Sequence, residues 1–520
     1  MALGTKRSAS LFAANAEKRD ALEYHDRPEP EVVPVIVDDT PEPSAEQEEE
    51  EQQEEEQEKE EQQEEEKKST DSSAAPLAAA PAAQADNSST PAEPTDKYVI
   101  TIVNNFVKKA EQAFSFVLDN VNIDRSEEGF SGDHKAALTV KGNGDTEIEL
   151  DGDNILKGGY YHAGLEKNDS DGTGTLTIKD DKKAADGSKG SLFAKGKEKG
   201  AGIGGGHWQD TSHITVTGGK ITATCGRFAA GIGGGNCSDG TDIIIKGDAT
   251  VIASGDTGAG IGGGGDGGNY TKGYGKVTIT DHANVTAWSE FGAGIGGGRN
   301  AGGDITISGD ATVAAEAYND SVAIGSGGQL YHSDNDKRLN TTITIRDRAN
   351  VTAVGSGYHP AIGSQGYISS FDGVSHPFTT TINILGGTLN VINKGNLKYS
   401  SSKVPAIGNQ STGGRYTNAD LVLNINASTG NTVINAYTTG SNAATIGKGS
   451  APIKDDEQIQ YNADGSSKFG EAGSVILHLF KKAITNESNN QIEDWGGWIL
   501  PLHEITSGEL YDTLHNAQWL

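Results

Sequence analysis

The sequence predicts an all-β solenoid, in which the chain winds through stacked coils of short parallel strands. The main observation is a tetrapeptide, Ala-Gly-Ile-Gly, that is followed each time by further glycines and begins at Ala201, Ala230, Ala259 and Ala293. Shortened forms continue the series at Ala323, Ala361, Ala406 and Thr445. At least eight copies of one unit, spaced by 29 to 45 residues, indicate a solenoid, because each unit buries its apolar face only against its neighbours.

Two further strands in each unit are indicated by alternating β-branched residues. In one copy, Ile243-x-Ile245 is followed by a Gly-Asp-Ala turn and then by Val251-x-Ala253, and this order recurs in the next copies. A period of two is typical of a strand that buries one face. We therefore expect three strands and three corners in each coil, on parallel sheets with no hairpins.

Equivalent isoleucines should then stack in two inward ladders. The first comprises Ile203, Ile232, Ile261, Ile295 and Ile324, and the second comprises Ile245, Ile279, Ile307 and Ile345. The longer units grow only near the glycine corner or just before the Ala-Ile-Gly strand, as stacked coils require, because their strands must stay in register.

Composition agrees with a solenoid and excludes two classes of protein. Seventy-one glycines and 34% hydrophobic residues suit a narrow inward stripe with many turns. The net charge of -31 argues against a nucleic-acid binder and against a basic membrane-surface protein. No segment approaches the ~20 apolar residues of a membrane span, so we expect no membrane insertion.

The sequence divides into four parts. An intrinsically disordered N-terminus is expected because residues 46–66 are almost entirely Glu and Gln and are followed by Ala/Pro-rich sequence. The parts are a disordered tail and linker (1–96), an N-terminal cap with a possible short helix (97–130), the β-helix repeats (131–472) and a C-terminal cap (473–520).

A resemblance to known proteins rests on the order of several motifs. Leu150-Asp151-Gly152-Asp153-Asn154-Ile155-Leu156, then His162-Ala163-Gly164-Leu165, then the Ala-Gly-Ile-Gly-Gly-Gly units, resemble the glycine-rich right-handed parallel β-helix regions of bacterial surface and secreted proteins, within the pectin-lyase-like superfamily. This resemblance implies a right-handed, single-stranded β-helix. It also implies an adhesin-like, carbohydrate-binding protein, or else a polysaccharide lyase or glycosidase.

The resemblance leads to three functional hypotheses. The first is a non-enzymatic, extracellular or surface-displayed protein that binds carbohydrate or a host surface. The second is a polysaccharide lyase or hydrolase, associated with a phage tail, and the third is a structural spacer. Neither a signal peptide nor a wall-sorting signal is recognisable, so the export route stays open.

Aromatic residues near the glycine corners are the candidate binding residues. Rings on a stack of loops form a platform for sugar faces, although they can also pack on one another to close the loops. The candidates are Trp208, Tyr270, Tyr274, Tyr331 and Tyr367, which follow the corner, and Trp288, which precedes it.

Other polar residues point only weakly to chemistry. The corner aspartates Asp248, Asp281, Asp310 and Asp347 align from coil to coil, but Asp in a turn usually bonds its own backbone, so we expect no catalytic residue among them.

Glycine-aspartate segments at 262–267 and 302–304 partly match calcium-binding repeats. The histidines lack metal spacing, and we expect no metal or cofactor. Whether Cys225 and Cys237 form a disulfide stays open.

Overall fold

The structure is a computed structural model, and its description covers sixteen segments of the chain. These are residues 31–36, 98–106, 113–127, 134–181, 188–265, 272–318, 321–328, 339–355, 359–365, 367–368, 378–393, 404–409, 417–418, 420–438, 446–448 and 475–481.

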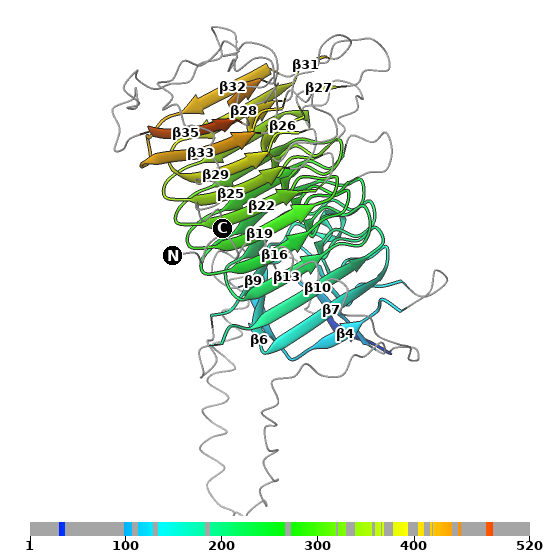
Figure 1. Ribbon diagram of the computed structural model, residues 1–520. Coiled ribbons are helices and arrows are strands. Elements are labelled where there is room, and N and C mark those ends of the chain that lie inside the picture. Colours follow the sequence, from blue (N-terminus) through cyan, green and yellow to red (C-terminus); the bar gives the residue numbers. More distant parts are fainter. Residues whose placement is uncertain are drawn as a thin grey trace, which may run out of the picture.

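The strands form three long parallel sheets, called A, B and C here, and each coil adds one strand to each sheet in turn (Figure 1). Sheet A carries the Ala-Gly-Ile-Gly strands, which have only two or three residues in most coils. Sheet A consists of β1 (Glu31–Ile36), β2 (Tyr98–Val103), β5 (Leu138–Lys141), β8 (Leu165–Glu166), β11 (Ile203–Gly204), β14 (Ile232–Gly233), β17 (Ile261–Gly262), β20 (Ile295–Gly296), β23 (Ile324–Gly325), β26 (Ile362–Ser364), β30 (Ile407–Asn409) and β34 (Ile446–Lys448).

Sheets B and C carry the two longer strands of each coil. Sheet B consists of β4 (Asn122–Asp124), β7 (Asp153–Tyr160), β10 (Ser191–Lys197), β13 (Lys220–Thr224), β16 (Thr250–Ser254), β19 (Asn284–Ser289), β22 (Thr312–Ala317), β25 (Asn350–Gly355), β29 (Gly387–Asn393), β33 (Thr432–Thr438) and β35 (Val475–Lys481). Sheet C consists of β3 (Phe114–Asp119), β6 (Thr146–Asp151), β9 (Leu176–Lys179), β12 (Ile214–Val216), β15 (Gly240–Ile245), β18 (Gly275–Ile279), β21 (Gly303–Ile307), β24 (Thr341–Ile345), β28 (Thr379–Ile384) and β32 (Asp420–Ile425). A small antiparallel pair, β27 (Tyr367–Ile368) with β31 (Thr417–Asn418), and one 3₁₀ turn, η1 (Asp169–Asp171), complete the described elements.

Both predicted isoleucine ladders are confirmed. In sheet A, Ile203 pairs with Ile232, and the same register continues through Ile324, with every ladder side chain fully buried. In sheet C, Ile245 pairs with Ile279 and the ladder continues in parallel register to the later coils. The protein is therefore a right-handed parallel β-helix with one continuous apolar core inside the stack.

The glycine that follows the ladder position in the sheet A strands from β11 to β34 has a backbone conformation that other residues rarely adopt. Its φ lies between 129° and 141° in Gly204, Gly233, Gly262, Gly296, Gly325, Gly363, Gly408 and Gly447. At Gly262, a Cβ atom would lie 2.0 Å from the carbonyl oxygen of Gly296 in the next coil. Glycine is thus required both by the φ angle and by the close approach of the next coil.

The two ends of the stack differ from simple caps. The expected N-terminal cap, 97–130, supplies β2, β3 and β4, one strand for each sheet, so its described residues form the first coil. In the expected C-terminal cap, β35 pairs in parallel with β33 and continues sheet B. Strand β1 lies in the part expected to be disordered and pairs with β2. The short helix expected in the N-terminal cap, after Phe106, lies largely outside the described residues.

We predict that Gly262→Ala lowers the free energy of unfolding by about 3 kcal/mol, because alanine is strained at this φ and its methyl group meets the next coil. Gly355→Ala is the control, since a Cβ there would lie 3.1 Å from its nearest neighbours and the φ of Gly355 is not left-handed. We expect the control to cost less than about 1 kcal/mol. Urea unfolding followed by circular dichroism measures both, and equal effects would contradict the glycine requirement.

Candidate functional site

The loops on either side of each sheet A strand lie next to each other. The amide of His207, after β11, donates to the carbonyl of Tyr161, which precedes β8 (2.8 Å). The same bond recurs one coil later, from Asn236 to Lys199 (3.0 Å). Because sheet A is only two residues wide here, these loops meet over it and form one continuous surface along the stack.

Five rings form a continuous row on this surface, and we call them the ring row. His134 lies 5.6 Å from Tyr160, measured between ring centroids, and Tyr160 lies 4.9 Å from Tyr161. Tyr161 lies 4.9 Å from His207, which in turn lies 4.6 Å from Trp208. Trp208 ends the row with 63% of its surface exposed, so the row presents a large ring to solvent.

Lysine side chains cover two rings of this row. Lys197 Nζ lies 5.3 Å from the centroid of Tyr160, and Lys199 Nζ lies 5.4 Å from that of Tyr161, within the range of cation–π attraction. Burial lowers the pKa of His207, and the charge of Lys199 lowers it further. His207 is therefore neutral at pH 7 and contributes an uncharged ring.

Two rings of the row lie on residues with left-handed backbone conformations. Tyr161 has a φ of 69° and Trp208 a φ of 60°, which is unusual for bulky residues. Cys237 and Asn300 occupy the position of Trp208 in later coils and have φ values of 56° and 75°. The conformation therefore belongs to the loop, whereas a tryptophan in it is particular to this coil and points to a role for the exposed ring.

The predicted candidates that the structure describes differ in exposure. Trp208 is exposed as expected, but Tyr274 is half-buried, and burial together with Asp304 and Asp239 raises its pKa to about 12. Trp288, near the end of β19, is only 8% exposed. The structure therefore does not bring these three residues together as one platform.

The remaining candidates fall largely outside the described residues. Tyr270 and Tyr331 are not described, and Tyr367 is described only as part of β27. The sequence reasoning missed His134, Tyr160, Tyr161 and His207, which form the row that Trp208 ends. The adjacent Tyr-Tyr pair just before the His162-Ala163-Gly164-Leu165 unit was the available signal.

A buried ion pair supports the row from the first coil. Lys157 Nζ lies 2.6 Å from Asp124 Oδ2, and each side chain is 9% exposed. The amide and hydroxyl of Ser126 donate to Asp124 Oδ1, and Lys197 Nζ donates to the carbonyl of Ser126. Burial by itself would raise the pKa of Asp124, but Lys157 and Ser126 outweigh it and hold the pKa below its ordinary value. The pair therefore fixes the backbone to which Lys197 binds.

The corner aspartates do not form one column, contrary to the sequence prediction. Strand register places Asp248, His282, Asp310 and Arg348 above one another, so that acidic and basic side chains alternate. Arg348 binds Asp310 through two nitrogens at 2.5 Å, and His282 lies 3.8 Å from the same carboxylate. The hydrogen bond and charge of Arg348 hold the pKa of Asp310 below its ordinary value.

The other two aspartates bond the turn of the neighbouring coil, whereas the sequence predicted bonds to their own backbone. Asp281 and Asp347 share a second column with Gly247 and Gly309, and all four residues have φ values between 59° and 66°. Asp281 accepts a hydrogen bond from the Gly247 amide, and Asp347 accepts one from the Gly309 amide, both at 3.1 Å.

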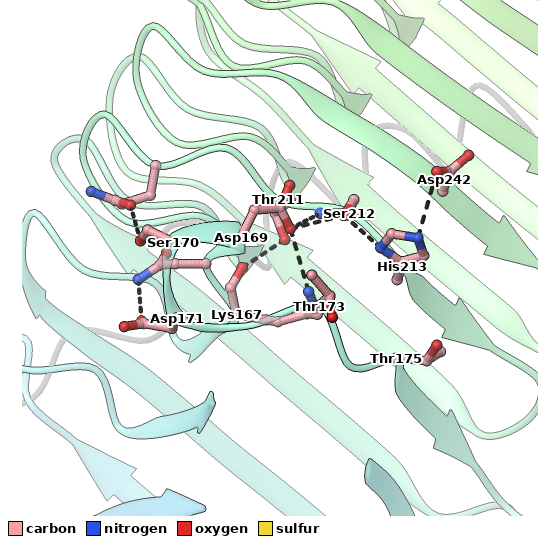
Figure 2. Close-up of polar contacts among 12 residues, drawn as sticks. Lys167, Asp169, Ser170, Asp171, Thr173, Thr175, Thr211, Ser212, His213 and Asp242 are labelled. Carbon is pink, nitrogen blue, oxygen red and sulfur yellow. Dashed lines mark hydrogen bonds and ion pairs between the residues drawn. The ribbon is translucent and has the colours of Figure 1, made fainter. Parts of the chain in front are cut away.

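A serine, a histidine and aspartates lie close together just before β12 of sheet C, as Figure 2 shows. Ser212 Oγ lies 2.6 Å from His213 Nδ1 and 2.8 Å from Asp169 Oδ1, which also accepts from the Ser212 amide. His213 Nε2 is 3.9 Å from Asp242, beyond hydrogen-bond range. Ser212 is 8% exposed, and its contacts with Asp169 join two coils, so this group stabilises the corner rather than presenting a nucleophile.

Among the described residues, no group of three or more His, Cys, Asp or Glu side chains is arranged to hold a metal ion. Cys225 and Cys237 are both thiols rather than a disulfide. Part of the segment 262–267 lies outside the described residues, so its calcium prediction stays untested.

No helix in the described part is long and apolar enough to cross a bilayer.

Comparison with known proteins supports the fold. Residues 214–236 and 277–299 match a family model described as a beta helix repeat. Comparison with curated proteins and with solved structures gave no significant match.

We predict that Asp124→Asn destabilises the protein by about 3 kcal/mol, because it leaves the Lys157 ammonium buried without its counter-charge. The carboxylate stabilises the fold above its unfolded-state pKa of about 4, and this contribution is lost as the pH falls below that value. The wild type should therefore lose this difference in stability at low pH. Thermal unfolding between about pH 3 and pH 7 measures the effect, with Asp248→Asn, whose side chain is 74% exposed, as a control of small effect. A pH-independent difference between wild type and Asp124→Asn would contradict the assignment.

Proposed function

We propose that this protein is a non-enzymatic, adhesin-like β-helix, extracellular or displayed on a cell surface, that binds carbohydrate or a glycan-bearing host surface through the ring row. The observation that carries the proposal is the exposure of Trp208, 63%, at the end of five neighbouring rings. Aromatic rings provide flat apolar area for the C–H faces of sugars, and polar groups at their edges bind hydroxyls.

Polar groups for sugar hydroxyls lie beside the row. His162 Nδ1 is 2.7 Å from Glu166 Oε2, next to Tyr161 in the chain. Gln209, which follows Trp208, accepts a hydrogen bond from Ser170 at 2.6 Å. The first pair lies within one coil and the second joins two coils, so a ligand that stacks on the rings would meet oriented donors and acceptors rather than mobile ones.

The alternation of charges favours binding over cleavage. A hydrolase on this fold needs a pair of carboxylates within roughly 5–10 Å of each other, so the comparison concerns hydrolysis. On sheet C, Lys276 lies between Asp242 and Asp304 in register and binds Asp242 at 2.6 Å. At the next corner, His282 stands between Asp248 and Asp310. A base therefore separates successive carboxylates in both columns, which supports a binding protein rather than a general acid and base pair.

A spacer function makes a different prediction, so substitution of the rings separates it from binding. We expect Trp208→Ala and Tyr161→Ala each to weaken glycan binding about tenfold or more, the loss of ~1.4 kcal/mol for a contacting ring. Tyr318→Ala is the matched control, since Tyr318 is 42% exposed and lies outside the ring row. A glycan array followed by calorimetry on the bound glycan measures the affinities.

Unchanged melting temperatures would show that the variants are folded. Binding that survives both ring substitutions, or that Tyr318→Ala reduces equally, would refute the ring row as the binding site. The absence of binding to any glycan would instead favour the spacer hypothesis.

A further inference from the structure

Positive charge gathers beside the ring row although the chain as a whole is strongly acidic. The protein has 42 basic and 73 acidic residues. Strand β10 and the loop after it nevertheless contain Lys195, Lys197 and Lys199, with Glu198 as the single acidic residue of residues 188–200. The net charge of this part is therefore opposite to that of the chain.

The next coil extends this basic patch. Arg227 lies with its guanidinium carbon 4.8 Å from the centroid of Phe228. Gly226 packs against the β10 loop so closely that a Cβ atom would lie 2.1 Å from the Glu198 amide nitrogen. Arg227 is thus placed next to the lysine loop. We define the basic patch as Lys195, Lys197, Lys199 and Arg227.

The basic patch and the ring row form one surface. Lys197 pairs in register with Tyr160, and Lys195 is exposed on the outer face of sheet B. Lys197 and Lys199 stand over the two tyrosine rings of the row. Ammonium groups held at ring faces lie within reach of the substituents of a sugar that stacks on the neighbouring rings.

We infer that the ring row takes an anionic glycan, one that carries carboxylate or sulfate groups, and that Lys195, Lys199 and Arg227 bind those groups. The inference rests on the proposed function and adds the ligand class to it. Ammonium and guanidinium groups form charge-assisted hydrogen bonds with carboxylate and sulfate oxygens. Screening confines the field of each charge to about 8 Å at physiological salt, so a short anionic ligand meets the basic patch and the single carboxylate of Glu198 rather than the acidic residues elsewhere on the chain.

Long polyanions fit this surface less well. A nucleic acid is bound mainly through many phosphate contacts along an extended basic stripe. In the next two coils, the equivalent loops carry Asp256 and Glu290 in place of basic residues. The basic patch is therefore short, and a polyanion that continued along the stack would meet like charges. An oligosaccharide end or a short segment suits it best.

Calorimetry on the full-length chain tests the inference with three hexasaccharides. The probes are one from hyaluronan, which carries carboxylates, one from carrageenan, which carries sulfates, and neutral maltohexaose. We expect at least one anionic probe to bind about tenfold more tightly than maltohexaose and to weaken as salt rises. We also expect Lys199→Gln and Arg227→Gln to weaken that probe threefold or more. Lys246→Gln, an exposed lysine on another corner, should leave it unchanged.

The outcomes separate the inference from the proposed function. Tighter binding of maltohexaose that is lost in Trp208→Ala but kept in Lys199→Gln would overturn the inference and leave the ring row as a glycan site. Binding of a DNA oligonucleotide as tight as that of the anionic sugars would overturn the glycan assignment of the patch. If no probe binds to the wild type, and Trp208→Ala changes no measured binding, both proposals are overturned.

Discussion

From β11 to β34, the stack depends on a backbone constraint at one glycine in each coil. Where a sheet A strand ends, φ is close to 130°, and a carbonyl of the next coil occupies the place of a Cβ atom, at 2.0 Å for Gly262. The chain can therefore turn sharply after two residues, and the coils can stack with their isoleucines in one buried ladder. Because eight successive coils repeat this turn, the constraint fixes how their three strands stack.

The same turn creates the surface on which the ring row lies. Because these sheet A strands are only two residues long, the loop before one strand lies close enough to bond to the loop after the strand of the next coil, as Tyr161 and His207 do. These loops make few contributions to the core, so their side chains can vary without disturbing the ladders. In the early coils these loops carry aromatic rings and lysines, and in later coils they carry cysteine, asparagine and arginine at corresponding positions. One rigid scaffold thus presents a different surface at each level.

Local repetition explains why the fold was predictable and the site was not. The ladders follow from Ile spacing and from period-two patterns, which lie within single units. The neighbours Tyr161 and His207 are 46 residues apart, and their contact depends on corner lengths that vary between coils. The aspartates were misaligned for the same reason, since Asp281 matches Gly247 rather than Asp248. Trp288 was assigned to the surface because the sequence alone does not show that its side chain is buried.

A crystal structure of the full-length protein with a bound anionic hexasaccharide tests the central claim most directly, namely that the ring row is the glycan site. The account predicts sugar rings stacked on Tyr161 and Trp208, with a carboxylate or sulfate within hydrogen-bond distance of Lys199 or Arg227. Sugar bound instead on the outer face of sheet C, beside Asp242 and Lys276, would contradict the claim.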